Sequence, residues 1–188
     1  MKRLKNKQLM CSAVFMGMLC LFLFSCHQEK KGTRLTDNQD RIIKVNAVVN
    51  CSVNTAFNYF IDNNLLSKWL AVTADVELIE GGKYELFWSP ENLDPTNNST
   101  YGCKVLAFER PHYLMFEWRG NADQKMFMNN VRPLTMVTVL FTSLGEKKTK
   151  ITLLHTGWRQ GTEWEAAREH FIKAWAAALN QLESILLL

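Results

Sequence analysis

His155 is the residue whose type and position most directly suggest chemistry. It ends the last predicted strand, residues 149–155, on the same side as Ile151 and Leu153, so its imidazole is expected to point into the core. A buried imidazole can act as a general acid or base. Because no carboxylate lies near it in the sequence, a structural histidine held by hydrogen bonds is the competing interpretation.

The sequence contains no pattern typical of metal binding or of nucleophilic catalysis. His112 falls in a turn and His170 beside the apolar side of a helix, and neither has a partner at metal-ligand spacing. The motifs HExxH, CxxC and GxSxG and a phosphate-binding glycine loop are absent. No metal and no cofactor is therefore expected, although a missing motif does not exclude an enzyme.

Cys26 follows a segment with the features of an export signal. Four basic residues within the first eight precede an apolar run over residues 9–24, which is short for a bilayer span. The residues Leu23-Phe24-Ser25-Cys26 resemble the lipobox of bacterial lipoproteins, in which the signal is cut before the cysteine and the cysteine receives lipid. An uncleaved single-pass anchor and a soluble secretory protein are the alternatives.

This resemblance implies three parts and a location. Residues 1–25 are the lipoprotein signal, residues 26–41 a polar flexible tether, and residues 42–188 one folded domain. The protein is then expected in the bacterial cell envelope, anchored by lipid on Cys26 to the outer membrane and facing the periplasm. Cys51 and Cys103 remain in the domain, where two buried free thiols are favoured over a disulfide.

The basic charge of the chain belongs to the predicted signal. Residues 1–25 hold four of the 22 Lys and Arg residues and none of the 18 Asp and Glu residues. Removing four from 22 leaves 18 basic residues against 18 acidic ones. A nearly neutral domain lacks the positive surface that nucleic-acid binding requires, so no nucleic-acid partner is expected.

The spacing of apolar residues in the domain predicts an α+β fold. A strand at residues 41–50 precedes two short helices, at residues 55–61 and 65–70, the first capped by Ser52. Alternation of apolar and polar residues then predicts six antiparallel strands. Their ranges are residues 74–78, 83–88, 100–109, 113–119, 134–142 and 149–155, with a long loop at residues 120–133.

One long helix is expected from Thr162 to the C-terminus. Thr162 and Glu165 have the spacing of a capping box, in which the threonine side chain caps the first turn. Its apolar side is rich in aromatic residues and comprises Trp164, Ala167, Phe171, Ala174, Trp175, Ala178, Leu182 and Ile185. Because the strands and this helix must bury their apolar faces against each other, we expect a curved antiparallel sheet of six to seven strands wrapped around the helix.

Several short motifs, taken in order, resemble a known family. They are Trp69 after the short helices, Gly81-Gly82-Lys83-Tyr84 at a strand start, Arg110-Pro111 in a turn, Val137-Thr138-Val139, Leu154-His155-Thr156-Gly157-Trp158, and Trp175 late in the helix. Together they look like the domain named after the activator of the heat-shock-protein ATPase, which belongs to the START-like, helix-grip (SRPBCC) superfamily. The resemblance spans roughly residues 42–186.

The resemblance implies a hydrophobic cavity between sheet and helix. Aromatic walls with a few polar tips suit a small apolar ligand, whereas a filled core is the alternative. The residues expected to face the cavity are Trp69, Tyr84, Trp88, Tyr101, Phe116, Trp118, Phe127, His155, Phe171 and Trp175. Trp175 is expected to face Trp118 and Phe116.

Three functions remain open from the sequence. The first is an envelope-associated binding module for a small hydrophobic molecule that is not identified. The second is an enzyme of the superfamily's cyclase or aromatase type, with His155 and Tyr101 as the candidate acid-base groups. The third is a co-chaperone-like domain that binds a protein partner, as the family name suggests.

Overall fold

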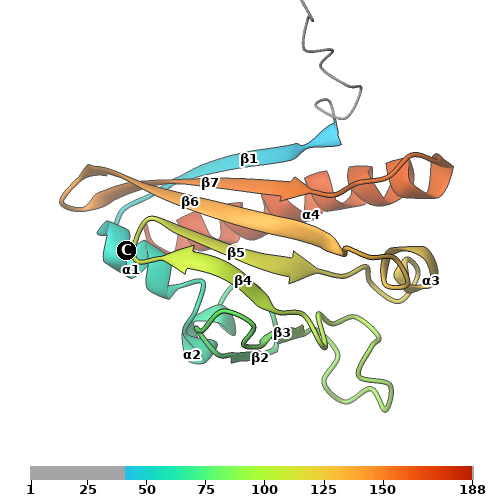
Figure 1. Ribbon diagram of the computed structural model, residues 1–188. Coiled ribbons are helices and arrows are strands. Elements are labelled where there is room, and N and C mark those ends of the chain that lie inside the picture. Colours follow the sequence, from blue (N-terminus) through green and yellow to red (C-terminus); the bar gives the residue numbers. More distant parts are fainter. Residues whose placement is uncertain (1–40, 188) are drawn as a thin grey trace, which may run out of the picture. The chain divides into compact units, whose positions relative to one another are not determined.

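The structure, a computed structural model, describes residues 41–187. The predicted signal, Cys26 and nearly all of the predicted tether lie outside the described residues. Five antiparallel strands form the main sheet in the order β1-β7-β6-β5-β4 (Figure 1). Their bounds are β1 Ile43–Val49, β4 Val105–Glu109, β5 Tyr113–Trp118, β6 Thr135–Gly145 and β7 Lys148–Thr156.

Two further strands, β2 Thr73–Val76 and β3 Tyr84–Phe87, form a separate antiparallel pair. Isolated bridges from Lys83 to Lys104 and from Phe87 to Ser99 connect β3 to the segment before β4. The predicted strand at residues 100–109 therefore begins later, at Val105, because Gly102 turns the chain with φ of 78°. The expected sheet of six to seven strands is thus divided into five and two.

Thr100 shows how this junction is held without a regular strand. Its buried hydroxyl accepts from the backbone N–H of Leu86 at 2.8 Å and donates to the carbonyl of Tyr84 at 2.8 Å. The hydroxyl therefore satisfies two backbone groups of β3 that would otherwise be buried unpaired.

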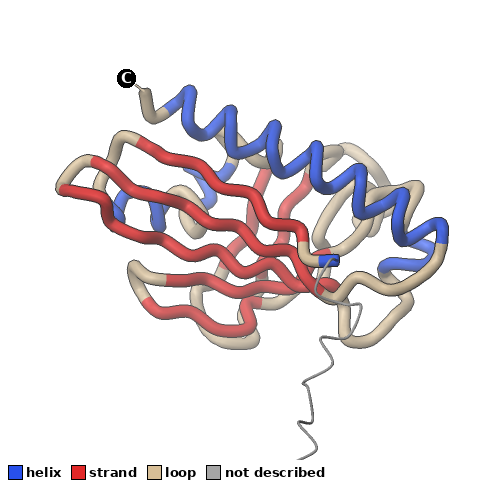
Figure 2. The backbone as a smooth tube through the Cα atoms, turned by 90° about the horizontal axis from the view of Figure 1, so that it is seen from above, coloured by secondary structure: helices blue, strands red, loops and turns tan. Residues whose placement is uncertain are grey.

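Helix α4, Thr162–Ile185, lies along one face of the main sheet (Figure 2). Its buried residues are Trp164, Ala167, Phe171, Trp175, Leu179 and Leu182, which confirms the predicted apolar side and adds Leu179. Since this face of the helix covers the inward face of the strands, the core of the domain lies between them.

The predicted capping box at the start of α4 is wrong. Gly161 occupies the N-cap position with φ of 125°, and no side chain caps the first turn. The Glu165 carboxylate instead binds Arg41 at 2.7 Å and Arg168 at 3.1 Å, so it is not free to reach back to the cap. Glycine is suited to this position because its φ lies in a region that other residues rarely adopt.

The short helices α1, Val53–Asn58, and α2, Asn63–Leu66, follow β1 as expected. Ser52 caps α1 by accepting from Thr55 N–H, and Asp62 caps α2 by accepting from Asn64 N–H and Leu65 N–H. A third short helix, α3, Lys125–Met128, lies within the segment predicted as a loop.

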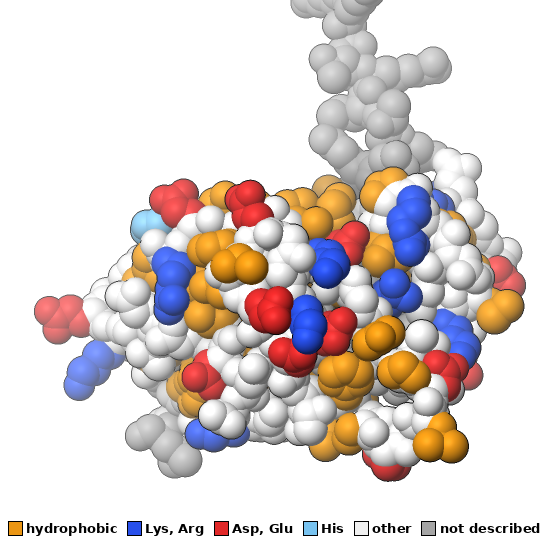
Figure 3. Space-filling view, turned by 60° about the horizontal axis from the view of Figure 1, so that its bottom comes forward, with side chains coloured by type: hydrophobic (Ala, Val, Ile, Leu, Met, Phe, Trp, Pro, Cys, Tyr) orange, Lys and Arg blue, Asp and Glu red, His pale blue; other side chains and the backbone are white. Residues whose placement is uncertain are grey.

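The described surface carries charges of both signs. On the face shown in Figure 3, Lys and Arg side chains are interspersed with Asp and Glu, and hydrophobic side chains gather in small groups. None of the helices within residues 41–187 is both long enough and apolar enough to cross a bilayer.

Candidate functional site

A cavity of about 260 Å³ lies between α4 and the residues that follow β3 and β5. Helix α4 provides one wall, and the end of β5 with the adjoining segments provides the other. The lining residues are Leu70, Trp88, Asn98, Ser99, Trp118, Arg119, Gly120, Asn121, His170, Phe171, Ala174, Trp175 and Ala178. Its volume is close to the lower end of the roughly 300–1,000 Å³ typical of ligand sites.

Aromatic rings form the inner walls of this cavity. The ring centroid of Trp118 lies 4.6 Å from that of Trp175, 5.8 Å from that of Trp88 and 6.3 Å from that of Phe171. Trp88 is held in place because its indole N–H donates to the Leu70 carbonyl at 2.6 Å. These walls present ring faces and edges at several angles, an arrangement that suits a flat apolar molecule.

The cavity exists because α4 presents small residues at this level. Ala174 and Ala178 both line it, one turn apart, and their methyl groups cannot fill the distance to Trp88 and Trp118. Near the start of the same helix, Trp164 and Phe171 face the sheet and are buried. The sequence pattern treats alanine and tryptophan alike as apolar, so the position of the cavity could not be read from it.

The cavity lining also includes polar residues. Asn98, Arg119 and Asn121 are partly buried, and His170 is exposed on α4. Asn98 joins two walls, because its carbonyl accepts from Trp88 N–H at 3.0 Å and its side-chain oxygen accepts from Ala122 N–H at 3.2 Å. The lining residues include no Asp or Glu, so the cavity has no negative side chain to pair with a cationic ligand.

His155 lies outside the cavity lining and is fully buried behind Trp175. The indole N–H of Trp175 donates to Nδ1 of His155 at 3.2 Å. Nδ1 is therefore an acceptor, which places the proton of the neutral ring on Nε2, an atom that has no partner among the described residues.

Burial lowers the pKa of His155 to about 3, so its imidazole is neutral at pH 7. Its neighbours are aromatic, with the Trp158 ring centroid at 4.5 Å and that of Phe171 at 5.4 Å. No carboxylate within residues 41–187 forms an ion pair with the ring. The imidazole therefore acts as the hydrogen-bond acceptor of Trp175 and has no acidic partner for proton transfer.

The structure places the predicted cavity residues in two groups. Trp88, Trp118, Phe171 and Trp175 line the cavity. Trp175 faces Trp118 as expected, whereas Phe116 is 6.0 Å from Trp118 and does not line the cavity. The residues placed elsewhere are Trp69, Tyr84, Tyr101, Phe116, Phe127 and His155.

Most of the second group fills the core. Tyr84 stacks on Phe116 at 3.8 Å and donates its hydroxyl to the Phe60 carbonyl at 3.0 Å, and burial raises the pKa of that hydroxyl. Trp69 packs edge-on against Phe60 at 4.9 Å.

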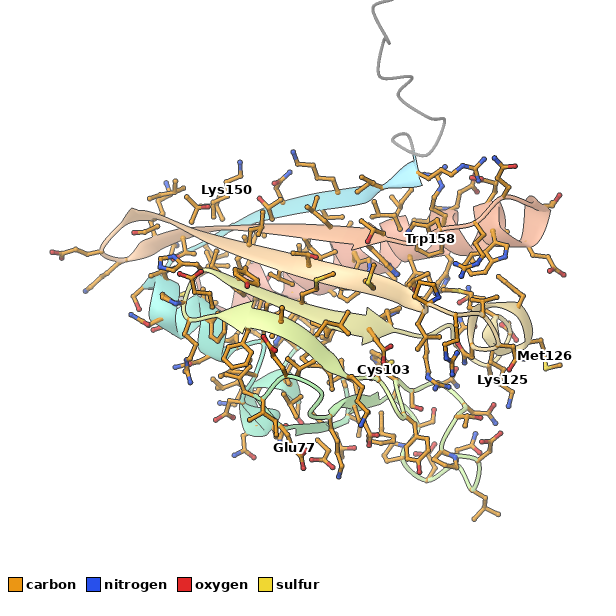
Figure 4. The ribbon with its side chains drawn as sticks, in the orientation of Figure 1. Glu77, Cys103, Lys125, Met126, Lys150 and Trp158 are labelled. Atoms are coloured by element: carbon orange, nitrogen blue, oxygen red, sulfur yellow. The ribbon has the colours of Figure 1, made fainter. Side chains whose placement is uncertain are left out.

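Phe127 and Tyr101 lie further from the centre of the domain. Phe127 packs against Trp164, with ring centroids 5.3 Å apart. The preceding residue, Met126, points outward and is exposed (Figure 4). Tyr101 is 45% exposed in the turn before β4. Because Tyr101 is on the surface and His155 is in the core, the two candidate acid-base groups do not share a site.

The cysteines of the described part of the chain do not form a disulfide. Cys51 and Cys103 are free thiols, the second buried and the first partly so. Residues 41–187 contain no cluster of His, Cys, Asp and Glu side chains that could hold a metal ion.

The fold and the cavity define a helix-grip α+β domain with a hollow between its long helix and its sheet. The family model described as "Activator of Hsp90 ATPase homolog 1-like protein" matches residues 50–187. The chain therefore belongs to this family, within the SRPBCC superfamily.

Solved structures with the same fold have low sequence identity to this chain. An HSP90 activator from Plasmodium falciparum is 21% identical with a TM-score of 0.58, covering 77% of this chain and 95% of its own. A Mycobacterium smegmatis protein is 19% identical with a TM-score of 0.59, covering 80% and 93%. The Aha1 dimer from Colwellia psychrerythraea is 16% identical with a TM-score of 0.56, covering 77% and 95%. None of the curated proteins matches this chain.

Proposed function

We propose that this domain is a binding module for a small, largely apolar molecule, held at a bacterial envelope membrane through lipid on Cys26. The observation that supports the binding role is the open cavity of about 260 Å³ with Trp88, Trp118, Phe171 and Trp175 in its walls. Water inside such a cavity meets apolar walls, so an apolar ligand gains free energy by displacing it.

The indole of Trp175 is prepared for this role before any ligand enters. Its N–H is satisfied by His155, so the polar atom is directed into the core and the ring is held against Trp118. A wall that is already ordered loses little side-chain entropy on binding, which increases affinity.

Native mass spectrometry of the protein purified from its own cells tests the binding role. We expect a small molecule to co-purify with the natural protein and to be lost when Ala178→Leu fills the cavity. Ala177→Leu is the matched control, because Ala177 is exposed on the same helix and does not line the cavity. The absence of any bound mass, or retention in Ala178→Leu, would argue against a ligand site here.

The envelope location is tested separately. Mass spectrometry of the mature N-terminus should find cleavage before Cys26 and lipid on that cysteine. An intact Met1, or cleavage at another position, would contradict the proposed anchor without affecting the cavity.

A protein-binding role is the second candidate, favoured by the match to the Hsp90-activator family over residues 50–187. Calorimetric titration of the domain with an Hsp90 from the same cells tests it. Heat of binding that survives Ala178→Leu would support a protein-binding surface distinct from the cavity, and the absence of heat would remove this candidate.

A further inference from the structure

The cavity wall opposite α4 contains a seam between two segments that are distant in the sequence. Residues 98–99 follow β3, residues 120–121 follow β5, and both pairs line the cavity. At the base of the seam the two segments are joined by aromatic packing, because the ring centroids of Trp88 and Trp118 lie 5.8 Å apart. Beyond these rings, the contacts that cross the seam are polar.

Three hydrogen bonds cross the seam in the described part of the chain. Nζ of Lys125, on α3, donates to a carboxylate oxygen of Asp94 at 2.8 Å and to the side-chain oxygen of Asn97 at 2.6 Å. The third bond runs from the N–H of Ala122 to the side-chain oxygen of Asn98 at 3.2 Å. Lys125 therefore makes two of the three connections, and we call this pair of bonds the latch.

The loop that Lys125 holds, residues 89–97, has little else to fix it and is called the flap loop. None of its residues is buried, and Figure 1 shows it extending from the end of β3, below α3. Within residues 41–187, Lys125 is the only residue outside the flap loop that hydrogen-bonds to it. A hollow of about 260 Å³ also lies between this loop and Thr73 and Phe87 of the strand pair. A segment with so few buried contacts opens locally at low cost.

The latch is charged but weak. The side chains of Lys125 and Asp94 are 28% and 44% exposed, and ion pairs at such positions contribute little and are screened by salt. The bond from Lys125, together with bonds from Thr96, lowers the pKa of Asp94 to about 2. The ion pair is therefore present at neutral pH and can still break and re-form readily.

We propose that the seam is the entrance through which a ligand reaches the cavity, and that Lys125 controls how often it opens. This proposal rests on the proposed binding function and adds the route of exchange. Release of Lys125 frees the flap loop to move, and Asn98 at its end moves with it. The wall then parts between Asn98 and Asn121, while the packed rings of Trp88 and Trp118 keep the base of the seam closed.

Stopped-flow fluorescence with N-phenyl-1-naphthylamine, a neutral hydrophobic probe, tests the proposal. Lys125→Met keeps an unbranched side chain but removes the ammonium group that makes both bonds of the latch. Because an ion pair and a hydrogen bond are lost, the association and dissociation rate constants should both rise about threefold to tenfold. Kd should stay the same within about twofold, since a latch that is equally present in the free and bound protein changes rates and not affinity.

Two further variants and a change of salt assign the effect to the latch. Lys83→Met is the matched control, because Lys83 forms an ion pair of the same length, 2.8 Å, with Asp75 and does not line the cavity. Neither rate constant should change in that variant. Asp94→Asn keeps an oxygen for Thr96 and weakens the bond to Lys125, so both rates should rise. Added sodium chloride should speed exchange in the natural protein more than in Lys125→Met.

Hydrogen exchange followed by mass spectrometry measures the flap loop without any ligand. Amides in residues 89–97 should exchange faster in Lys125→Met than in the natural protein, whereas those of α4 should exchange at the same rate. Unchanged exchange in residues 89–97 would show that Lys125 does not hold the loop.

The outcomes separate the entrance from the binding function. If the natural protein binds the probe and Lys125→Met exchanges it at the natural rates, the binding function stands and the seam is not the entrance. Faster dissociation alone, with a weaker Kd, would make Lys125 a support of the binding wall and would also overturn the proposal. If the natural protein does not bind the probe, both proposals fail.

Discussion

Two regions of the interface between α4 and the sheet are both rich in aromatic residues, but only one is hollow. The packed region comprises His155, Trp158 and Trp164, near the start of α4. Phe171 belongs to both regions, because it packs on Trp158 and also lines the cavity. The hollow region comprises Trp88, Trp118, Ala174 and Ala178, further along the helix. The difference is in the helix, because two of the α4 residues that face the hollow region, Ala174 and Ala178, have only methyl side chains.

Trp175 forms the boundary between the two regions. Its indole N–H binds His155 on the packed side, and its ring lies 4.6 Å from Trp118 on the hollow side. The comparison shows that one side chain can be fully buried and still form the wall of a cavity. It also predicts that equal truncations on the two sides will have different consequences for stability and for binding.

The largest loss of stability is expected from Trp158→Ala in the packed region. Trp158 is 6% exposed, packs on His155 and Phe171, and donates to the His155 carbonyl at 3.0 Å. Its removal should lower the free energy of unfolding by about 3–5 kcal/mol, measured by urea denaturation. Affinity for a hydrophobic fluorescent probe should change less than about twofold, and a much larger change would mean that the two regions are not separate.

Trp175→Ala should destabilise the domain less than Trp158→Ala does, but it should weaken ligand binding more. Because one side of the ring already faces the cavity, the free energy of unfolding should fall by about 3 kcal/mol, near the lower end of the range for Trp→Ala. Affinity for a hydrophobic fluorescent probe should fall strongly. Trp175→Phe is the matched variant, since it keeps a ring beside Trp118 but removes the bond to His155. A large stability loss with unchanged probe binding would show a filled core at this position instead.

The fold could be predicted from the sequence because strands and helices that bury one face show a regular spacing of apolar residues. The alternation over β6 and β7 and the apolar side of α4 follow from burial on one face, and the structure confirms both. The cap at Thr162 was not readable, since Glu165 is taken by Arg41, a residue 124 positions away.

The cavity lining depends on contacts between distant segments. Asn98 lies in a turn outside any helix or strand, and no periodic pattern marks it. Arg119 was expected at the end of the strand at residues 113–119, but β5 ends one residue earlier, at Trp118. Tyr101 was expected on an inward strand face, but the turn at Gly102 places it at the surface. Side chains that follow strand ends are therefore the ones that a sequence pattern locates least well.

His155 should make the stability of the packed region depend on pH. Its pKa is about 3 in the folded domain and about 6.5 in an unfolded chain, so the unfolded state binds more protons between these values. The free energy of unfolding is unaffected by this group above pH 6.5 and decreases as the pH falls below it, by about 2 kcal/mol from pH 7 to pH 5.

Urea denaturation of the natural protein and of His155→Gln at several pH values isolates this contribution. Glutamine does not titrate, so the difference between the two proteins should narrow as the pH falls. Parallel pH profiles would show that the histidine exchanges protons equally in both states and is not enclosed as the structure indicates.

The smallest change in stability is expected from Ala178→Leu, which acts on the hollow region alone. The added side chain extends into existing space, so the free energy of unfolding should change by less than about 1.5 kcal/mol in either direction. The same side chain occupies the volume of the cavity, and affinity for the hydrophobic fluorescent probe should fall at least about tenfold. Calorimetry and urea denaturation of one preparation measure both quantities.

Ala177→Leu provides the comparison for this substitution, because Ala177 is the neighbouring residue on α4 and is exposed. The two variants have the same composition and similar helix propensity, so any difference between them comes from the side of the helix that is changed. Retained affinity in Ala178→Leu would mean that the ligand does not occupy the space beside Trp118. Loss of affinity in both variants would point to a disturbed helix, and the packed and hollow regions could then not be treated as independent.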